Sequence, residues 1–390
     1  MDEQTAPSKP IRLANLDAIR GLGVLGIFFL NIYFMGNSFF GYAPHEVQPS
    51  SDIGILIFSN FFLEGRFFSL FAMIFGVGML IQYQRQQMEM EMEMEMEMDT
   101  ATTTQKNKHI KSRQYWLIAF GVIHAIFIFP GDILLSYGVA GLLAFRYIRL
   151  SADELISKAK WFIFLSLIPI ALISLMPDDQ VYSRESAFFT EQLSAWTGSY
   201  SQQLKLHLSL FAYMLAVIPL TLMWYIAGLM LLGMALYKRN IFIDGLDNKT
   251  LWQCVFWAVV LSSLDSLLSL SGNPMWEAIS DLLLWFSALA TALIYIHIIV
   301  KLCKNTPHRL TLLQNVGKLA FSLYILQSLV GILLLRYIAP EWLYSLDRIG
   351  YLSIAIIHSL LQLVLADVYL RIFNQGPLEK LWRMLVSRTS

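Results

Sequence analysis

The chain has 390 residues, of which 56% are hydrophobic and 14% are charged, and its 28 basic residues balance its 28 acidic residues. A soluble globular domain carries about a quarter charged residues, so this composition argues against one. A net charge of zero gives no indication of a nucleic-acid partner. The apolar residues come in long blocks rather than in the alternating pattern of membrane β-strands. We therefore expect an all-α protein, a polytopic transmembrane helix bundle in contact with the lipid bilayer.

Hydropathy predicts about ten spans, because each apolar block approaches the ~20 residues that cross ~30 Å of hydrocarbon. Residues 53–63 are apolar as well, and we expect them to form an interfacial or re-entrant helix that leads into the second span. The expected spans, in chain order, are 13–35, 60–82, 114–129, 132–148, 161–176, 208–236, 251–271, 276–300, 318–337 and 349–371.

The distribution of positive charge predicts the orientation of these spans. Twenty-two of the 28 lysine and arginine residues fall in the two terminal tails and in alternate loops. Only four fall in the other five loops: Arg184, Lys205, Arg336 and Arg348. The positive-inside rule then places both termini in the cytoplasm, in a multi-pass protein of the bacterial inner membrane. Cys254 and Cys303 lie near cytoplasmic span ends and are expected to be reduced thiols.

The chain divides into three regions by its motifs. Residues 1–150 form an N-terminal transmembrane region with an LD-x-x-RG helix and an H-x7-D element. Residues 151–230 hold the middle spans and the one sizeable extracytoplasmic loop, 177–207, which we expect to be solvated and to lie partly on the interface. Residues 231–390 form a C-terminal transmembrane domain. The alternation of Met and Glu at 88–98 predicts a solvated, low-complexity extension in a cytoplasmic loop.

Asp17 and Arg20 are three residues apart near the cytoplasmic end of the first span, so they share one helical face. Ionisable groups inside a span are costly and therefore informative. One interpretation is a mutual ion pair in which Arg20 reaches toward the interface. The other is a cation that faces an anionic ligand, such as a phosphate, arriving from the cytoplasm.

A second polar group is predicted in the outer half of the membrane. Given the predicted topology, Asn31, His45, Arg66, His124 and Asp132 all fall at a similar depth. A histidine, a carboxylate, and amide or guanidinium donors are the parts of a general acid/base site with electrostatic stabilisation. The alternative is a polar plug of interhelical hydrogen bonds, each worth roughly 0.6 kcal/mol.

Further polar residues in the later spans are typical of interhelical hydrogen bonds rather than of chemistry. These are Asp265, Asp281, Tyr324, Gln327, Ser328, His358, Gln362 and Asp367. His109, His207 and His308 are expected to be solvated, in loops or at span ends. The chain has no G-x-x-x-x-G-K-[ST], H-E-x-x-H or C-x-x-C pattern, so no nucleotide or metal site is predicted.

Four segments together resemble the YeiB-like family of bacterial inner-membrane proteins of unknown activity. They are RLANLDAIRGLGVLGIFFLNI at 12–32, EGRFFSLFAMIFGVG at 64–78, GVIHAIFIFPGDILLSYGVAG at 121–141, and a C-terminal pair, GKLAFSLYILQSLVG at 317–331 with FNQGPLEKLWR at 373–383. The resemblance covers most of the chain in order. It implies a membrane-embedded helical fold and names no activity.

The first segment more distantly resembles transmembrane acyltransferases such as heparan-α-glucosaminide N-acetyltransferase. Those proteins open with an LD-x-x-RG helix that ends in an Asn, and a His follows in the next lumenal loop. Asp17, Arg20 and Asn31 match the helix, and His45 is the His of the following loop. The resemblance implies that Asn31 and His45 act on acyl transfer, with acetyl-CoA reaching the site from the cytoplasm. Trp-Asn-Gly does not follow His45 here, which makes His124 a rival to it.

Three functional hypotheses follow. The first is an acyltransferase that moves an acyl group from a cytoplasmic acyl-CoA to an extracytoplasmic sugar or lipid acceptor, with Asp17 and Arg20 on the donor side. The second is a transporter or flippase for a small amphipathic solute, although no internal repeat typical of transporters is evident. The third is a non-enzymatic membrane protein.

Overall fold

Every regular element in the computed structural model is a helix, over the residues that it describes, which are 14–37, 41–95, 103–175 and 183–389. The expected all-α class is therefore confirmed. The helices are α1 (Ala14–Gly36), α2 (Ser50–Phe62), α3 (Arg66–Glu95), α4 (Thr103–Phe127), α5 (Leu134–Phe145), α6 (Ala152–Ser174), α7 (Ala187–Thr197), α8 (Tyr200–Val217), α9 (Leu222–Lys238), α10 (Ile241–Asp244), α11 (Asn248–Ser269), α12 (Pro274–Lys304), α13 (Thr311–Lys318), α14 (Ala320–Ile332), the π-helix η1 (Leu333–Ile338), α15 (Trp342–Ser345), α16 (Arg348–Ile372) and α17 (Pro377–Thr389).

Seven described segments are long and apolar enough to cross a membrane: α1, α2 with α3, α6, α11, α12, α14 with η1, and α16. The α8–α9 pair makes an eighth if it is one span, and it bends by 63° near Pro219. The two remaining expected spans correspond to α4, which carries Lys111 and Arg113, and α5, which has only 12 residues. The chain is thus a multi-pass helical membrane protein, and the number ten stays a prediction.

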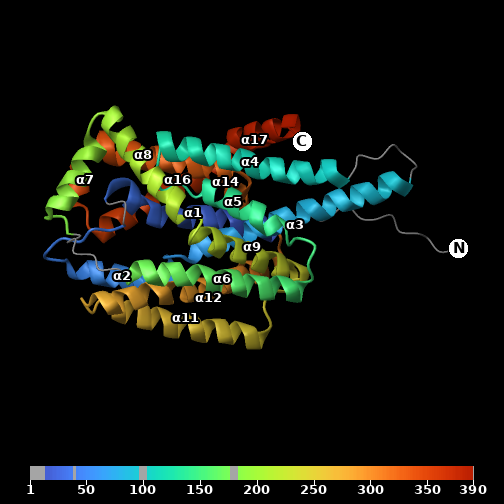
Figure 1. The fold of residues 1–390 in the computed structure, drawn as a ribbon, viewed down its shortest axis with the longest axis horizontal. Helices are drawn as coiled ribbons and strands as arrows, with labels where there is room; N and C mark the ends of the chain where they lie inside the picture. The colour runs from blue at the N-terminus through green and yellow to red at the C-terminus, as the bar shows by residue number, and fades with distance from the viewer. Residues whose placement is uncertain (1–13, 38–40, 96–102, 176–182, 390) are drawn as a thin grey trace.

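Most helices run along the long axis of the molecule (Figure 1). Helix α7 lies at one end, and the last turns of α3 lie at the opposite end. The C-terminal helix α17 lies beside the first half of α4, where the Trp382 indole donates to the Arg113 carbonyl at 3.2 Å. Helix α7 and the charged start of α4 therefore lie toward opposite ends of the bundle.

Two close helix crossings hold the centre of the bundle together. A Cβ added at Gly21 of α1 would clash with the Leu313 carbonyl of α13, and one at Gly317 would clash with the Asp17 carbonyl. Helices α3 and α9 meet in the same way through Gly76 and Gly233, each against backbone atoms of the partner helix. Small residues let helix backbones approach closely in membranes, where van der Waals packing drives association.

The structure differs from the sequence-based expectation in the segment 177–207. Instead of a solvated loop, its described part forms α7 and the first turns of α8. Phe189, Leu193 and Trp196 are buried, and their spacing of four and three residues places them on one face of α7. This face packs into the outer end of the bundle, so the segment is part of the fold.

Two smaller expectations concern the cytoplasmic side. Helix α3 continues through the Met–Glu repeat to Glu95, because Glu and Met are both good helix formers; residues 96–98 lie outside the described part. Cys254 and Cys303 are free and buried, which confirms the expected thiols.

Candidate functional site

His124 and Asp132 form a buried pair at the turn between α4 and α5. The His124 Nδ1 atom lies 2.8 Å from Asp132 Oδ1, and the two residues are 1% and 5% exposed. A carboxylate oxygen only accepts, so Nδ1 carries the hydrogen, and Nε2 of the neutral ring is an acceptor. Nε2 has no hydrogen-bond partner among the described residues. This arrangement leaves a basic nitrogen free at a buried position.

The local sequence explains how this pair forms. The His124 carbonyl accepts hydrogen bonds from the amides of Ile128 and Phe129 at 2.9 and 2.8 Å, which ends α4. Pro130 and Gly131 then turn the chain. Asp132 Oδ2 accepts from the Leu135 amide at 2.8 Å in the first turn of α5, as a capping carboxylate does. One carboxylate therefore starts α5 and orients the His124 ring.

The walls around the His124 ring are aromatic. The Phe129 and Tyr324 rings lie 6.2 and 5.4 Å from it, centroid to centroid, and the Tyr324 hydroxyl accepts from the Ile133 amide at 3.2 Å. Gly121 stands one turn before His124, where a Cβ would lie 2.7 Å from Asp132 Oδ2. Because Gly121 has no side chain, the start of α5 can approach α4 closely enough for Asp132 to contact His124.

Arg66 occupies a separate buried polar site. It is 0% exposed, and its Nη2 atom donates to Ser262 Oγ at 2.8 Å and Ser287 Oγ at 3.0 Å, and also to the Asn60 carbonyl. Its Nη1 atom donates to the Glu64 carbonyl. These contacts join α2, α3, α11 and α12. No hydrogen bond among the described residues links Arg66 to His124.

The remaining two candidates of the outer group also have surroundings of their own. His45 lies in the loop before α2, where Nδ1 is 3.3 Å from Glu185 Oε1. Asn31 of α1 has a buried amide nitrogen without a hydrogen-bond partner in the described part of the chain. Of the five residues predicted at one depth, only His124 and Asp132 contact each other through a hydrogen bond in the described part of the chain.

His45 belongs to a set of contacts that fastens the outer loops together. The Glu185 carboxylate accepts from the Glu46 amide at 3.0 Å. Desolvation opposes ionisation of Glu185, but hydrogen bonds from backbone amides and from His45 outweigh it and lower the pKa of this carboxyl. Arg184 next to it donates to the Ala43 carbonyl at 3.0 Å. This loop contact is structural.

Asp52 anchors the same loops from α2. It accepts from the Tyr42 hydroxyl at 2.5 Å and from the Arg348 amide at 3.0 Å. The Arg348 guanidinium lies 4.2 Å from the centre of the Tyr42 ring. Burial, together with the Asp52 hydrogen bond, raises the pKa of the Tyr42 hydroxyl, which is therefore a donor at neutral pH.

Near the other end of α1, Asp17 and Arg20 form the expected ion pair, with Arg20 Nη1 3.0 Å from Asp17 Oδ1. Two further arginines, Arg113 and Arg383, lie close to Arg20. The charges of Arg20 and Arg383 both repel the Arg113 guanidinium. Arg113 stacks over the Trp382 ring at 4.3 Å. Arginines from α1, α4 and α17 therefore gather here beside the Asp17 carboxylate, which gives this end a positive local charge.

Several polar residues of the later spans join helices, as expected. Gln327 Nε2 donates to Gln362 Oε1 at 2.8 Å, and Gln362 Nε2 donates to the Leu323 carbonyl at 3.1 Å. Ser280 Oγ donates to Asp265 Oδ1 at 2.5 Å. The expectation of a solvated His207 is wrong, because this residue is 2% exposed inside the outer end of the bundle.

No group of three His, Cys, Asp or Glu side chains in the described residues is placed to hold a metal ion. The buried dyad can instead accept and return a proton, as a base oriented by a carboxylate does.

Comparison with known proteins identifies relatives of the chain. Residues 236–389 match the family model described as Protein of unknown function (DUF418). The chain is 25% identical to Uncharacterized protein YeiB of Escherichia coli (strain K12) over 405 aligned positions, with 97% of each chain covered. The chain is therefore similar to YeiB-like proteins over nearly its whole length. It is also 24% identical to Uncharacterized protein YxaH of Bacillus subtilis (strain 168), with 95% of this chain and 93% of the relative covered.

The similarity to these YeiB-like proteins runs over nearly the whole chain, whereas the family model matches only its C-terminal part. That part contains Tyr324, α14, η1, α16 and α17. The His124–Asp132 pair lies outside it, in the N-terminal half. The two halves meet at the pair, because Tyr324 of α14 packs against the His124 ring.

Proposed function

We propose that the chain is a bacterial inner-membrane acyltransferase in which His124 is the general base. The observation that supports this proposal is the buried His124 ring, held through Nδ1 by Asp132 and with Nε2 free. His358 also has a buried Nε2 atom without a hydrogen-bond partner among the described residues, so the feature that distinguishes His124 is the carboxylate that orients its ring. Here the orienting carboxylate is present, and the basic nitrogen is left for another molecule.

The chemistry starts with an acceptor hydroxyl or amine that donates a hydrogen bond to His124 Nε2. As the acceptor oxygen or nitrogen attacks the carbonyl carbon of an acyl thioester, Nε2 takes the acceptor proton and Asp132 stabilises the resulting imidazolium. The C–S bond then breaks, and Nε2–H returns the proton to the leaving thiolate. The products are an ester or amide and a free thiol, so protons and electrons balance without an oxidant.

The arginines at the cytoplasmic end support an anionic donor. Arg20, Arg113 and Arg383 come together from three helices, and such a group suits the phosphates of an acyl-CoA. Arg113 and His124 are eleven residues apart on α4, which is about 16 Å along a helix. A donor bound at the arginines must therefore carry its acyl group on a long, narrow arm.

The decisive experiment uses purified protein in nanodiscs with [14C]acetyl-CoA and bacterial lipid extract. We expect slow hydrolysis or labelling of a lipid or added sugar by the wild-type chain. His124→Gln keeps the size and polarity of the side chain but removes the base, and should lower the rate by about 10²–10⁴-fold.

The matched control is His358→Gln. His358 is also buried and also has an Nε2 atom without a partner, but no carboxylate among the described residues forms a hydrogen bond with it. The control should keep the wild-type rate. An unchanged rate in His124→Gln, with folding intact by size-exclusion chromatography, would refute the proposal.

A further inference from the structure

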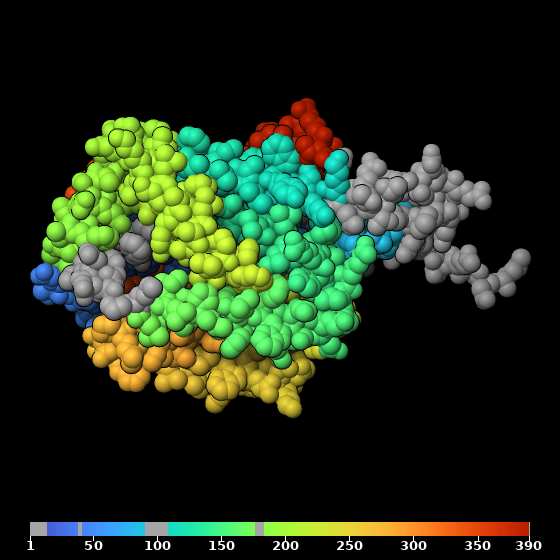
Figure 2. All heavy atoms as spheres, viewed as in Figure 1, coloured from blue at the N-terminus to red at the C-terminus, as the bar shows by residue number. Residues whose placement is uncertain are grey.

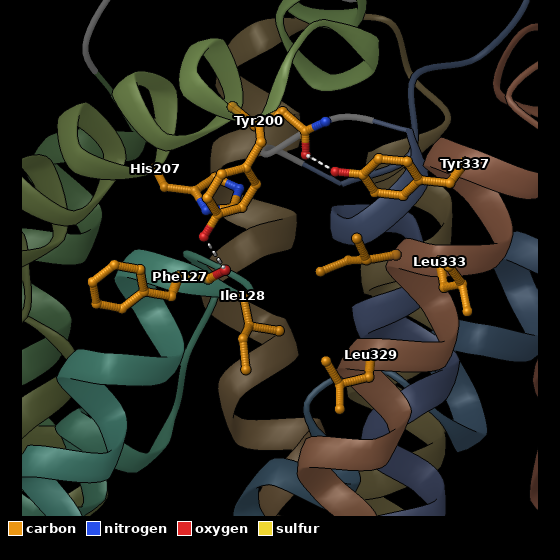
Figure 3. Close-up of a pocket in the computed structure, with 9 residues that line it drawn as sticks. Phe127, Ile128, Tyr200, His207, Leu329, Leu333 and Tyr337 are labelled. Carbon is orange, nitrogen blue, oxygen red and sulfur yellow. Dashed lines mark hydrogen bonds between the residues drawn. The ribbon is translucent and has the colours of Figure 1, made fainter.

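A pocket opens in the outer half of the bundle, apart from the His124–Asp132 pair, between the end of α4, α8 and the α14–η1 helix. Its volume is about 210 Å³. Ile128, Leu329 and Ile332 make an apolar wall, whereas Tyr200, His207 and Tyr337 are polar lining residues. Figure 3 shows the polar side chains gathered at one end of the pocket and Ile128 and Leu329 at the other. The pocket is therefore amphipathic.

The pocket lies on a surface that faces lipid. Its lining residues Phe127, Leu329 and Leu333 are 52%, 48% and 54% exposed, and α14 with η1 is a candidate membrane span. Exposed apolar side chains on a spanning helix contact acyl chains rather than water. The polar end lies toward the loop that follows η1, which the charge distribution places outside the cytoplasm. A ligand can thus enter from the outer leaflet with its head at the polar end.

A buried cation stands behind the polar end. The Nδ1 atom of His207 donates to the Ile126 carbonyl at 3.0 Å, so its Nε2 atom is an acceptor and receives Arg336 Nη1 at 3.3 Å. Arg336 is 3% exposed, stacks over the Trp196 ring at 3.5 Å, and donates from Nε to the Met35 carbonyl at 2.9 Å.

Within the described part of the chain, Arg336 has no anionic partner that would balance its charge. Its partners there are a carbonyl, an imidazole and an indole ring, and its Nη2 atom makes no hydrogen bond. An uncompensated charge at this depth is costly and is retained mostly for function. His207, which lines the pocket, accepts the hydrogen bond from Arg336 Nη1, so the positive charge lies directly behind the polar end of the pocket.

We propose that this pocket binds a lipid of the extracytoplasmic leaflet whose head group is anionic, a phosphate or a carboxylate. The chain of the lipid packs on Ile128, Leu329 and Ile332. The hydroxyls of Tyr200 and Tyr337 already donate to the Phe127 carbonyl and to Gln203 Oε1, so the charge of the head is balanced by Arg336, which lies directly behind His207. The site is independent of acyl transfer at His124 and does not rest on it.

The test uses three photoactivatable probes in nanodiscs of the full chain: a phosphatidylglycerol, a fatty acid and a zwitterionic phosphatidylcholine. Cross-linked peptides are located by mass spectrometry. We expect the anionic probes to label residues 200–207 and 329–337, with phosphatidylcholine labelling these peptides at least about tenfold less, since its head group has no net charge for Arg336 to balance. The two anionic probes distinguish a phosphate from a carboxylate head.

Two variants make the result specific. Arg336→Gln should lower anionic labelling about tenfold, to the level of phosphatidylcholine. Leu333→Trp fills the pocket from an exposed position, so it should remove labelling by every probe while leaving the fold intact. Its control is Leu360→Trp, because Leu360 is an exposed apolar residue of α16 that does not line the pocket.

Labelling outside these peptides in the wild-type chain would overturn the site. Equal labelling by phosphatidylcholine, or labelling unchanged in folded Arg336→Gln, would overturn the anionic head. Unchanged labelling in Leu333→Trp would show that the probes do not occupy the pocket.

Discussion

At the scale of single residues, Asp132 connects the fold to the candidate chemistry. Its Oδ2 atom accepts from the Leu135 amide and its Oδ1 atom accepts from His124 Nδ1, so both oxygens are used. A carboxylate can accept both hydrogen bonds, whereas an amide can accept only with its oxygen. The carboxylate thus determines which nitrogen of His124 is the base.

Replacing Asp132 with Asn tests this role without any substrate. The Asn oxygen is expected to keep the Leu135 hydrogen bond, which leaves its NH₂ group facing His124 Nδ1. Nδ1 must then become the acceptor, so the proton moves to Nε2. ¹⁵N NMR of histidine-labelled protein should show the change of tautomer at His124. The His207 signal is an internal control, because its Nδ1 atom donates to a carbonyl that the substitution does not touch. An unchanged His124 tautomer would contradict the assignment.

The sequence predicts some of these residue-scale features and misses others. The pairing of His124 with Asp132 could be predicted because a single turn, Pro130-Gly131, brings the two residues back together. The buried His207–Arg336 pair could not, because its members are 129 residues apart and no short turn of the chain brings them together. The sequence also places Arg66 in the predicted cluster, because its expected depth is the same. Depth alone does not specify which face of a helix a residue occupies, and Arg66 faces a different set of helices.

At the scale of helices, close packing depends on individual glycines rather than on a general content of small residues. Gly76 and Gly78 are two residues apart in α3, and as small residues both could permit close helix packing. The structure supports this only for Gly76, which lies against the Met230 backbone of α9; a Cβ at Gly78 would meet no atom within 4 Å. Two residues rotate a helix by about 200°, which accounts for the difference.

These two positions allow a matched prediction. Gly78→Ala should be neutral or slightly stabilising, because alanine is favoured over glycine inside a helix by up to about 1 kcal/mol. Gly76→Ala should destabilise the chain by about 1–3 kcal/mol, because α3 and α9 must move apart. Thermal unfolding of both variants in the same detergent measures the difference. Equal midpoints, or a lower midpoint for Gly78→Ala, would show that the α3–α9 crossing is not the tight contact.

The helices that the sequence misplaces share a physical cause. Helix α7 lies within a stretch that carries several polar residues, yet Phe189, Leu193 and Trp196 give it one apolar face, which suffices for packing at the end of a bundle. Helix α4 begins at Thr103, well before its apolar stretch, because nothing in that polar segment breaks a helix. Average hydropathy detects membrane spans, but it detects neither a short helix with one apolar face nor a polar extension of a longer helix.

At the scale of the whole molecule, the placement of both proposed sites depends on the orientation of the bundle. Seven or eight described segments qualify as spans, and α4 with α5 adds two crossings or none, because the two helices are joined by a short turn. If α8 and α9 together cross the membrane once, the total is an even number of spans. This holds whether or not the α4–α5 pair crosses. An even number puts the termini on one side, in agreement with the charge distribution.

We predict that both termini and the loop before α11 are cytoplasmic and that the loop before α2 is extracytoplasmic. Val47→Cys, at a position that is 88% exposed, should react with a membrane-impermeant maleimide in intact cells, whereas Lys249→Cys should react only after the membrane is opened. The native thiols Cys254 and Cys303 are 9% and 6% exposed and should give little background. A fluorescent protein that matures only in the cytoplasm, fused after Ser390, should be bright. Labelling of Lys249→Cys in intact cells, or a dark fusion, would reverse the orientation. The pocket beside Arg336 would then face the cytoplasmic leaflet, and the arginines near Asp17 would face outward, away from any acyl-CoA.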